Sequence, residues 1–240
     1  VNRYSLADAS DLITAFHEAH PLNQVGGIQR AAWWRQYQVM KHADWEVAVY
    51  TNQANEVAGY LIYQRQGTTL VLEELMTSDV ASQQQLVNFI FKHQSAYTTI
   101  QYASGMNQAL ADLLPDPRVL KTTIVPYMMA RIVNLGAFLA DYPYQIAEMA
   151  PVTLAITDEF IPRNQGIWQI SVHAGQPTIT RLATQAADLS LSIQALTKAL
   201  MGYRALTSLL QYGQITGDQP TAERFNPALV HEKPMLWDYF

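Results

Sequence analysis

Few side chains in this sequence have the types and spacing that catalysis or metal binding requires. His17 and His20 stand three residues apart near the end of an expected helix, a spacing that metal ligands can use. The zinc-protease pattern needs histidines four residues apart with a glutamate between them, and histidines at a helix end commonly meet the helix dipole or solvent. The other four histidines are scattered along the chain. The sequence therefore predicts no metal site.

The motifs of the common catalytic classes are absent from the sequence. It contains no cysteine, which excludes disulfides, thiolate zinc or iron–sulfur sites and a cysteine nucleophile. It also contains no Gly-x-Ser-x-Gly, no P-loop and no Gly-x-Gly-x-x-Gly. Glu73 and Glu74 are adjacent near the end of an expected strand, where neighbouring side chains point to opposite faces. The two carboxylates therefore cannot act as a general acid/base pair.

The remaining feature that could bind a ligand is a stretch of aromatic residues. Trp33 and Trp34 stand beside Arg35 and Tyr37 in one expected helix. Such a patch could bind a sugar or a base, but tryptophans at helical spacing usually pack in a core or an interface. We interpret this stretch as packing.

Composition narrows the class of protein. Of 240 residues, 49% are hydrophobic and 15% charged, which indicates folded cores rather than disorder. The net charge of −5 offers no basic surface for nucleic acid or anionic lipid. No run approaches the ~20 apolar residues that cross a bilayer, and the first residues have no signal-peptide pattern. We expect a cytoplasmic protein with no nucleic-acid partner and no membrane span.

The first half reads as a mixed α/β domain. Ser5 is an expected helix cap, with Asp8 in the first turn. Residues 46–50 and 57–64 alternate around a Gln53-Ala54-Asn55 turn, which predicts a hairpin. The expected helices cover 7–20, 29–41, 81–93 and 107–113, and the expected strands cover 46–50, 57–64, 69–75 and 98–102.

The second half reads as a sheet covered by helices on one side, so the class is α+β. A breaker cluster at 113–117 and a strand-like run at 119–125 precede Pro126, where we place the domain boundary. The expected domains are 1–125 and 126–240. The expected strands of the second domain are 127–133, 152–157, 166–174 and 178–183, and its expected helices are 136–142, 193–201, 203–212 and 222–228.

The junction between the expected strand 69–75 and the expected helix 81–93 lacks glycine and arginine. That order resembles a GCN5-related N-acetyltransferase domain, in which a loop rich in glycine and arginine holds the coenzyme A pyrophosphate at a helix N-terminus. Here the junction at 73–82 has neither residue type, and it places Asp79 where the anion would sit. We expect that this domain has lost acetyl-CoA binding.

Short segments spread over the whole chain carry a further resemblance. They are Gly-Ile-Gln-Arg at 27–30 with Trp33-Trp34, 59–63, 71–75, 129–134, Asp158 with Asn-Gln-Gly at 164–166, 187–189, Gly202-Tyr203 and the terminal 238–240. In this order the chain resembles the central and C-terminal domains of the Eis (enhanced intracellular survival) family of N-acetyltransferases.

The resemblance implies a fold and a reaction. Residues 1–125 would be a degenerate acetyltransferase-like domain, and residues 126–240 a sterol-carrier-protein-like domain. Family members bind acetyl-CoA in an earlier domain, which would precede Val1, acetylate amines and assemble as hexamers. By this resemblance the chain holds no cofactor itself, helps to shape the amine acceptor pocket and forms a homo-oligomer.

The resemblance also assigns two site residues. The terminal carboxylate of Phe240 would be the catalytic base, and Tyr239 would bind substrate at a position where a characterised member has an acidic residue. The aromatic tail Trp237-Asp238-Tyr239-Phe240 is compatible with docking, because exposed tails are usually polar. A tail that packs only on its own domain remains the alternative.

A different class of function is a lipid- or sterol-binding module. A sterol-carrier-like fold can enclose an apolar tunnel, which five leucines of the second half could line: Leu196, Leu200, Leu206, Leu209 and Leu210. Leucines at helical spacing are core by default, so this remains the alternative.

Overall fold

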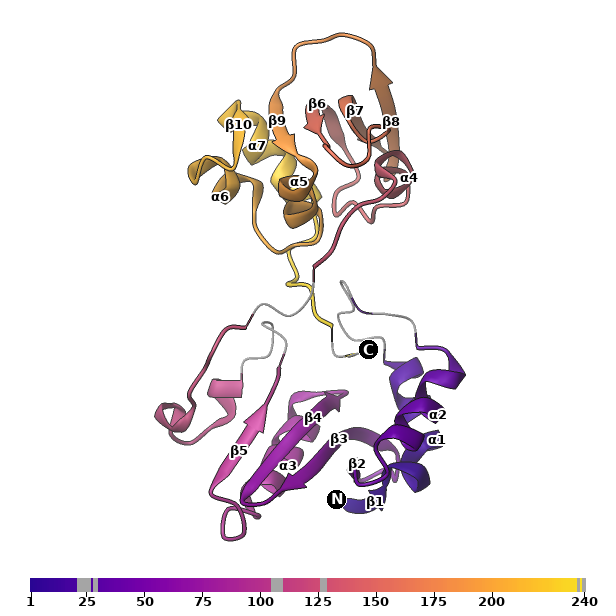
Figure 1. Ribbon diagram of the computed structural model, residues 1–240, viewed down its shortest axis with the longest axis vertical. Helices are drawn as coiled ribbons and strands as arrows, with labels where there is room; N and C mark the ends of the chain where they lie inside the picture. Colours follow the sequence, from indigo (N-terminus) through magenta and orange to yellow (C-terminus); the bar gives the residue numbers. More distant parts are fainter. Residues whose placement is uncertain (21–26, 28–29, 105–109, 126–128, 237, 239–240) are drawn as a thin grey trace. The chain divides into compact units, whose positions relative to one another are not determined.

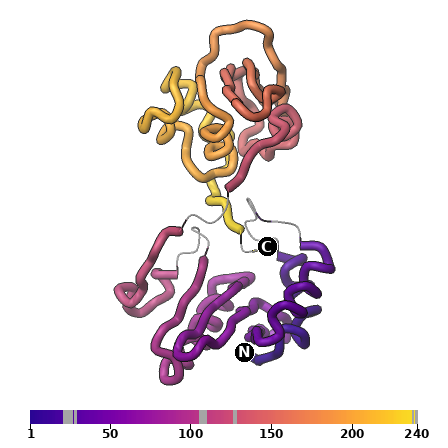
Figure 2. The backbone as a smooth tube through the Cα atoms, viewed as in Figure 1, coloured from indigo at the N-terminus to yellow at the C-terminus, as the bar shows by residue number. Residues whose placement is uncertain are grey.

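The computed structural model describes residues 1–20, 27, 30–104, 110–125, 129–236 and 238 (Figure 1). The chain divides into two compact units, Val1–Thr123 with Met235–Phe240, and Ile124–Pro234. Figure 2 traces their backbone from indigo at the N-terminus to yellow at the C-terminus. The described residues form one five-stranded sheet in each unit, which confirms the α+β class. Pro126, the expected boundary, lies outside the described residues.

The first unit contains a sheet with the strand order β1-β2-β3-β4-β5. The strands β1 to β4 pair antiparallel, and β4 pairs with β5 in parallel. Their bounds are β1 Asn2–Ser5, β2 Glu46–Thr51, β3 Val57–Gln66, β4 Thr69–Thr77 and β5 Thr99–Tyr102. The expected hairpin is confirmed as β2 and β3. The strand β1 was not predicted, because a segment of four residues is too short to show a periodic pattern.

Helices cover both faces of this sheet: α1 (Leu6–Ala19), α2 (Ala32–Lys41) and α3 (Val80–Phe91). In Figure 1 α1 and α2 lie side by side, and α3 packs against β2, β3 and β4. Alternate residues of β3 enter two separate cores. Tyr60 and Ile62 pack with α1, and Leu61 and Tyr63 pack with α3.

A β-bulge in β4 decides which side chains face α1. Ile62 pairs with Glu74 and Tyr63 pairs with Leu72, so Glu73 is the extra residue. Leu72 and Leu75 therefore share the α3 core, although strict alternation would separate them. Because of this shift, Glu74 lies on the α1 side with Met76.

Two expected strands and part of one expected helix are wrong. No strand forms over 119–125, where the chain makes a turn of 3₁₀ helix, Pro117–Val119, and continues without a partner strand. Residues 129–133 are not a strand either, and Met129 and Val133 are exposed. Strand preference depends on packing, and the side chains of these segments are exposed apart from Ile132, which is buried in the core of the second unit. Of the expected helix at 107–113, residues 107–109 lie outside the described part, and Leu110–Leu113 is a 3₁₀ turn.

The second unit has the strand order β10-β9-β6-β7-β8, in which only β6 and β9 pair in parallel. Its strands are β6 Met149–Thr157, β7 Gly166–His173, β8 Gln176–Leu182, β9 Leu189–Ser192 and β10 Ile215–Gly217. Its helices are α4 Leu135–Ala140, α5 Ile193–Leu200, α6 Leu206–Gln211 and α7 Gln219–Phe225. The short strands β9 and β10 were not expected.

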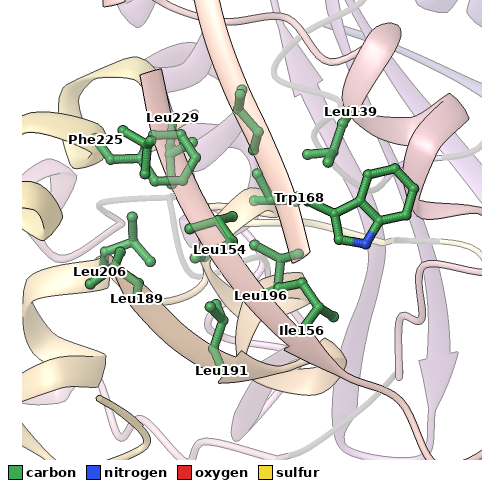
Figure 3. Close-up of a cluster of buried hydrophobic side chains, with 14 of the residues drawn as sticks. Leu139, Leu154, Ile156, Trp168, Leu189, Leu191, Leu196, Leu206, Phe225 and Leu229 are labelled. Atoms are coloured by element: carbon green, nitrogen blue, oxygen red, sulfur yellow. The ribbon is translucent and has the colours of Figure 1, made fainter. Parts of the chain in front are cut away.

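A single hydrophobic core fills the second unit. Alternate residues of β7, namely Trp168, Ile170 and Val172, are buried in it. In Figure 3 Trp168 and Leu139 lie at one end of this cluster, and Phe225 and Leu229 lie at the other. The indole Nε1 of Trp168 donates to the backbone oxygen of Asn164 at 2.9 Å, which satisfies its polar atom.

The five leucines considered as a tunnel lining are core residues. Leu196, Leu200, Leu206 and Leu209 are at most 1% exposed, and Leu210 packs against the same cluster. None of the five lines the hollow of about 70 Å³ beside Gly202 or the open one of about 350 Å³ beside Arg131.

Candidate functional site

A buried cluster of charged side chains lies in the first unit, among β3, β4, the residues before α2 and the C-terminal segment. Arg30 is its centre. Its Nη1 donates to Oε1 of Glu74 at 2.9 Å, and its Nε donates to Oδ1 of Asp238 at 3.0 Å. The three side chains are only 5–8% exposed. One guanidinium therefore bridges two buried carboxylates from distant parts of the chain.

Tyr60 completes the surroundings of Glu74. Its hydroxyl donates to Oε1 of Glu74 and lies 3.0 Å from Sδ of Met76. Burial and the nearby Glu74 charge raise the pKa of Tyr60 well above its usual value. The phenol therefore stays protonated and remains a hydrogen-bond donor at neutral pH.

Glu74 is ionised despite its burial. Burial by itself would raise the pKa of this carboxyl, but the charges of Arg30 and Arg35 and the hydrogen bonds from Arg30 and Tyr60 lower it to about 2. Glu73 has a different partner, the side-chain amide of Gln64. The two adjacent glutamates therefore have separate partners, although the bulge at Glu73 breaks the strict alternation on which the expectation of opposite faces rested.

The C-terminal segment reaches this cluster through Asp238. Oδ1 of Asp238 accepts a hydrogen bond from Nε1 of Trp34 at 2.8 Å as well as the one from Arg30. Trp34 is 4% exposed, so the packing role expected for it is confirmed, whereas Trp33 is 61% exposed. Trp34 thus contributes a directed N–H to a carboxylate in addition to its buried ring.

His17 in α1 and His20 directly after it have separate partners. Nδ1 of His17 lies 3.2 Å from Sδ of Met76, while Nδ1 of His20 lies 3.0 Å from the backbone oxygen of Phe16. Burial, followed by the charge of Arg30, lowers the pKa of His17. Among the residues that the structure describes, no group of three or more His, Asp or Glu side chains could hold a metal ion.

The N-terminus of α3 is closed by its own cap. Oδ1 of Asp79 accepts from the backbone N–H of Ser82 at 2.7 Å, and the Ser82 side chain meets the Asp79 backbone in return. The Ser82 N–H bond, followed by the Ser78 hydroxyl, lowers the pKa of Asp79. A carboxylate therefore occupies the place at which an open helix N-terminus binds phosphate.

A second buried polar group lies in the second unit. Asp158 accepts hydrogen bonds from the backbone N–H groups of Phe160 and Ile161 and from the side chain of Asn164, and it pairs with Arg131. Oδ1 of Asn164 accepts from the backbone N–H of Leu135 at 2.9 Å. These bonds tie the chain before α4 to the loop after β6, so we interpret the group as structural.

The two site residues named from the sequence, Tyr239 and Phe240, lie outside the described residues. Asp238, which directly precedes them, is the last residue that the structure describes. Sequence reasoning missed the pairing of Arg30 with Asp238. Both residues belong to segments that carried the family resemblance, which was the only signal for either of them. In the described residues no helix is long and apolar enough to cross a membrane.

The sequence is similar to two domain families. It matches an acetyltransferase (GNAT) domain over residues 26–132 and a sterol carrier protein domain over residues 135–237. No curated protein matches it significantly.

Solved structures resemble the chain over its whole length. A probable N-acyltransferase from Enterococcus faecalis V583 is 32% identical, with a TM-score of 0.90, and the chain covers 61% of it. A GCN5-related N-acetyltransferase from Anabaena variabilis (19% identical, TM-score 0.79) and Eis1 from Mycobacterium abscessus (21% identical, TM-score 0.75) share the fold, and the chain covers 62% of each. It spans about three fifths of these relatives. The chain thus combines a GNAT-like acetyltransferase domain with a sterol-carrier-protein-like domain that follows it.

Proposed function

We propose that this chain is the central and C-terminal part of an Eis-like N-acetyltransferase, which transfers an acetyl group from acetyl-CoA to an amine. The observation that carries the proposal is the likeness over the whole chain to the Enterococcus faecalis probable N-acyltransferase, of which the chain spans 61%. The acetyl-CoA site would belong to a domain that precedes Val1.

The chain itself would not bind the cofactor. Backbone N–H groups at a helix N-terminus hold phosphate when they are free and the field is positive. In α3 the Asp79 carboxylate accepts the Ser82 N–H and adds a negative charge. These residues do not fit a pyrophosphate. Calorimetry with acetyl-CoA on this chain should therefore show no micromolar binding, and saturable binding would contradict this part of the proposal.

In the complete protein, the proposed contribution of the chain to the reaction is a base. Acetyl-CoA supplies the acetyl group as a thioester. An ammonium group has no lone pair, so the acceptor must lose a proton before nitrogen bonds to the acetyl carbon. The carbon–sulfur bond of the thioester then breaks, and coenzyme A leaves as the thiolate, which takes up a proton. The terminal carboxylate of Phe240 would take that proton, and Tyr239 would contact the amine. The anchoring of Asp238 in the first unit supports a docked tail. Assembly as a homo-oligomer, hexameric by resemblance, belongs to the same proposal.

The test uses the full-length gene product and a panel of amines. Deleting Phe240, or extending the chain beyond it by a few residues, should abolish acetyl transfer while the fold and acetyl-CoA binding persist. A change of Phe240 to Leu keeps the carboxylate at the same chain position and should retain most of the turnover. Undiminished activity of the extended protein would rule out the terminal carboxylate as the base.

A further inference from the structure

The charges of the buried cluster balance only when Asp238 is present. Arg30 and Arg35 bring two guanidinium groups, and Glu74 and Asp238 bring two carboxylates. Arg35 is itself buried, 6% exposed, with its Nη1 donating to Oε1 of Gln38. If Asp238 left, two buried cations would face a single carboxylate, which is unfavourable at low polarity. The first unit is therefore built to hold a carboxylate at this place.

The geometry around Asp238 is that of a directed carboxylate-binding site. Two donors, Nε of Arg30 in the chain before α2 and Nε1 of Trp34 in α2, converge on one oxygen, Oδ1, at 3.0 Å and 2.8 Å. Arg30 is itself held from the other side by Glu74, which fixes the direction of its guanidinium. Charge-assisted bonds of this kind are the strongest hydrogen bonds in proteins. They fix the chain at Asp238, two residues before Phe240.

We propose that Asp238 is a positioning residue: its carboxylate, bound by Arg30 and Trp34, holds the C-terminal segment on the first unit and so places the terminal carboxylate for proton transfer. The claim that Asp238 places the terminal carboxylate for proton transfer rests on the proposed function. The claim that Asp238 anchors the C-terminal segment concerns this chain alone.

Chain length sets the size of the effect. An extended chain spans about 3.4 Å per residue, so two residues keep the C-terminal residue within ~7 Å of Asp238. If Asp238 is released, the tether starts at Pro234, the end of the second unit, and six residues reach ~20 Å. The accessible volume grows with the cube of the reach, by about 25-fold, and the effective concentration of the base falls by the same factor.

The kinetic experiment compares Asp238→Asn with the wild-type full-length protein. Asparagine keeps the size and an acceptor oxygen but removes the charge. We expect kcat to fall by up to about 25-fold, the value for complete release of the tail, while KM for acetyl-CoA stays unchanged. The loss should shrink as the pH rises above the pKa of the amine, because the acceptor then needs no base. Activity lost through misfolding would not return at higher pH. Asp44→Asn, which removes an exposed carboxylate of the same unit, should behave like the wild type.

The anchoring experiment measures hydrogen exchange of the peptide 235–240 in the 240-residue chain. In Asp238→Asn its exchange should accelerate about ten- to hundredfold. Trp34→Phe, which removes the indole N–H and keeps a smaller aromatic ring, should accelerate it less. Unchanged exchange in Asp238→Asn would overturn the anchor. Accelerated exchange with unchanged kcat would overturn the positioning role. A full-length protein that acetylates no amine would instead overturn the proposed function, while the exchange result would still decide the anchor.

Discussion

Arg30 and Asp238 stand 208 residues apart in the sequence, yet Nε of Arg30 lies 3.0 Å from Oδ1 of Asp238. Both side chains are buried, and Asp238 belongs to a segment that leaves the sterol-carrier-like unit and joins the acetyltransferase-like unit. The first unit therefore consists of residues from both ends of the given sequence, and one of its buried ion pairs is made by a segment that follows the second unit.

Replacement of Arg30 by methionine should destabilise the first unit strongly. The change leaves the buried carboxylates of Glu74 and Asp238 without their shared cation, which costs about 3–5 kcal/mol when a buried pair is broken. Chemical denaturation followed by circular dichroism measures the loss. Arg118→Met provides the control, because Arg118 pairs with Asp116 at the surface, and this variant should unfold at the wild-type denaturant concentration. Equal midpoints for the two variants would contradict the bridging role of Arg30.

The stability of the first unit should depend on Glu74 at acidic pH. The folded-state pKa of Glu74 is lowered to about 2 from an ordinary value of 4.5. Its stabilising contribution is therefore complete above pH 4.5 and is lost as the pH falls toward 2, a change of about 3 kcal/mol. Glu74→Gln should be less stable at pH 7, where Arg30 keeps only one carboxylate, and its stability should vary less between pH 4.5 and 2. Identical slopes for variant and wild type would refute the assignment.

Gly202 should not tolerate a side chain. Its φ is +69°, and a Cβ at this position would lie 2.1 Å from the backbone oxygen of Glu232. An alanine would meet the left-handed penalty of about 1–2 kcal/mol and an overpacking penalty of about 1–3 kcal/mol. Gly213 has nearly the same φ, +66°, and nothing within 4 Å of its Cβ position. Gly213→Ala should therefore show the first penalty alone, and thermal unfolding of both variants compares them.

Removal of the α3 cap should weaken the helix without creating a cofactor site. Asp79→Ala loses the acceptor for the Ser82 N–H, and its melting temperature should fall, whereas Asp79→Asn keeps a capping oxygen and should stay close to the wild type. Neither variant should bind acetyl-CoA, because the junction still lacks the glycines that let a backbone approach phosphate. Calorimetric binding to Asp79→Ala would show that the cap alone blocks the site.

Much of the fold was decided by local chemistry that a sequence displays. The hairpin of β2 and β3 follows from alternating residues around a turn, and the cap of α1 follows from Ser5. These interactions join residues within a few positions of one another, so the residue types suffice. The absence of a glycine-rich phosphate-binding loop at 73–82 can likewise be recognised from the residue types alone.

The candidate site, in contrast, was decided by tertiary structure. Strict alternation would place Glu74 with Leu72 in the α3 core, and only the bulge at Glu73 turns it toward Arg30. A bulge depends on how two strands pair, which periodicity within one strand does not reveal. The partner of Arg30 is likewise absent from its sequence neighbourhood. The chain carries 15 basic and 20 acidic residues, and only the folded backbone selects Asp238 from the other acids, because an ion pair requires proximity in space and not in sequence.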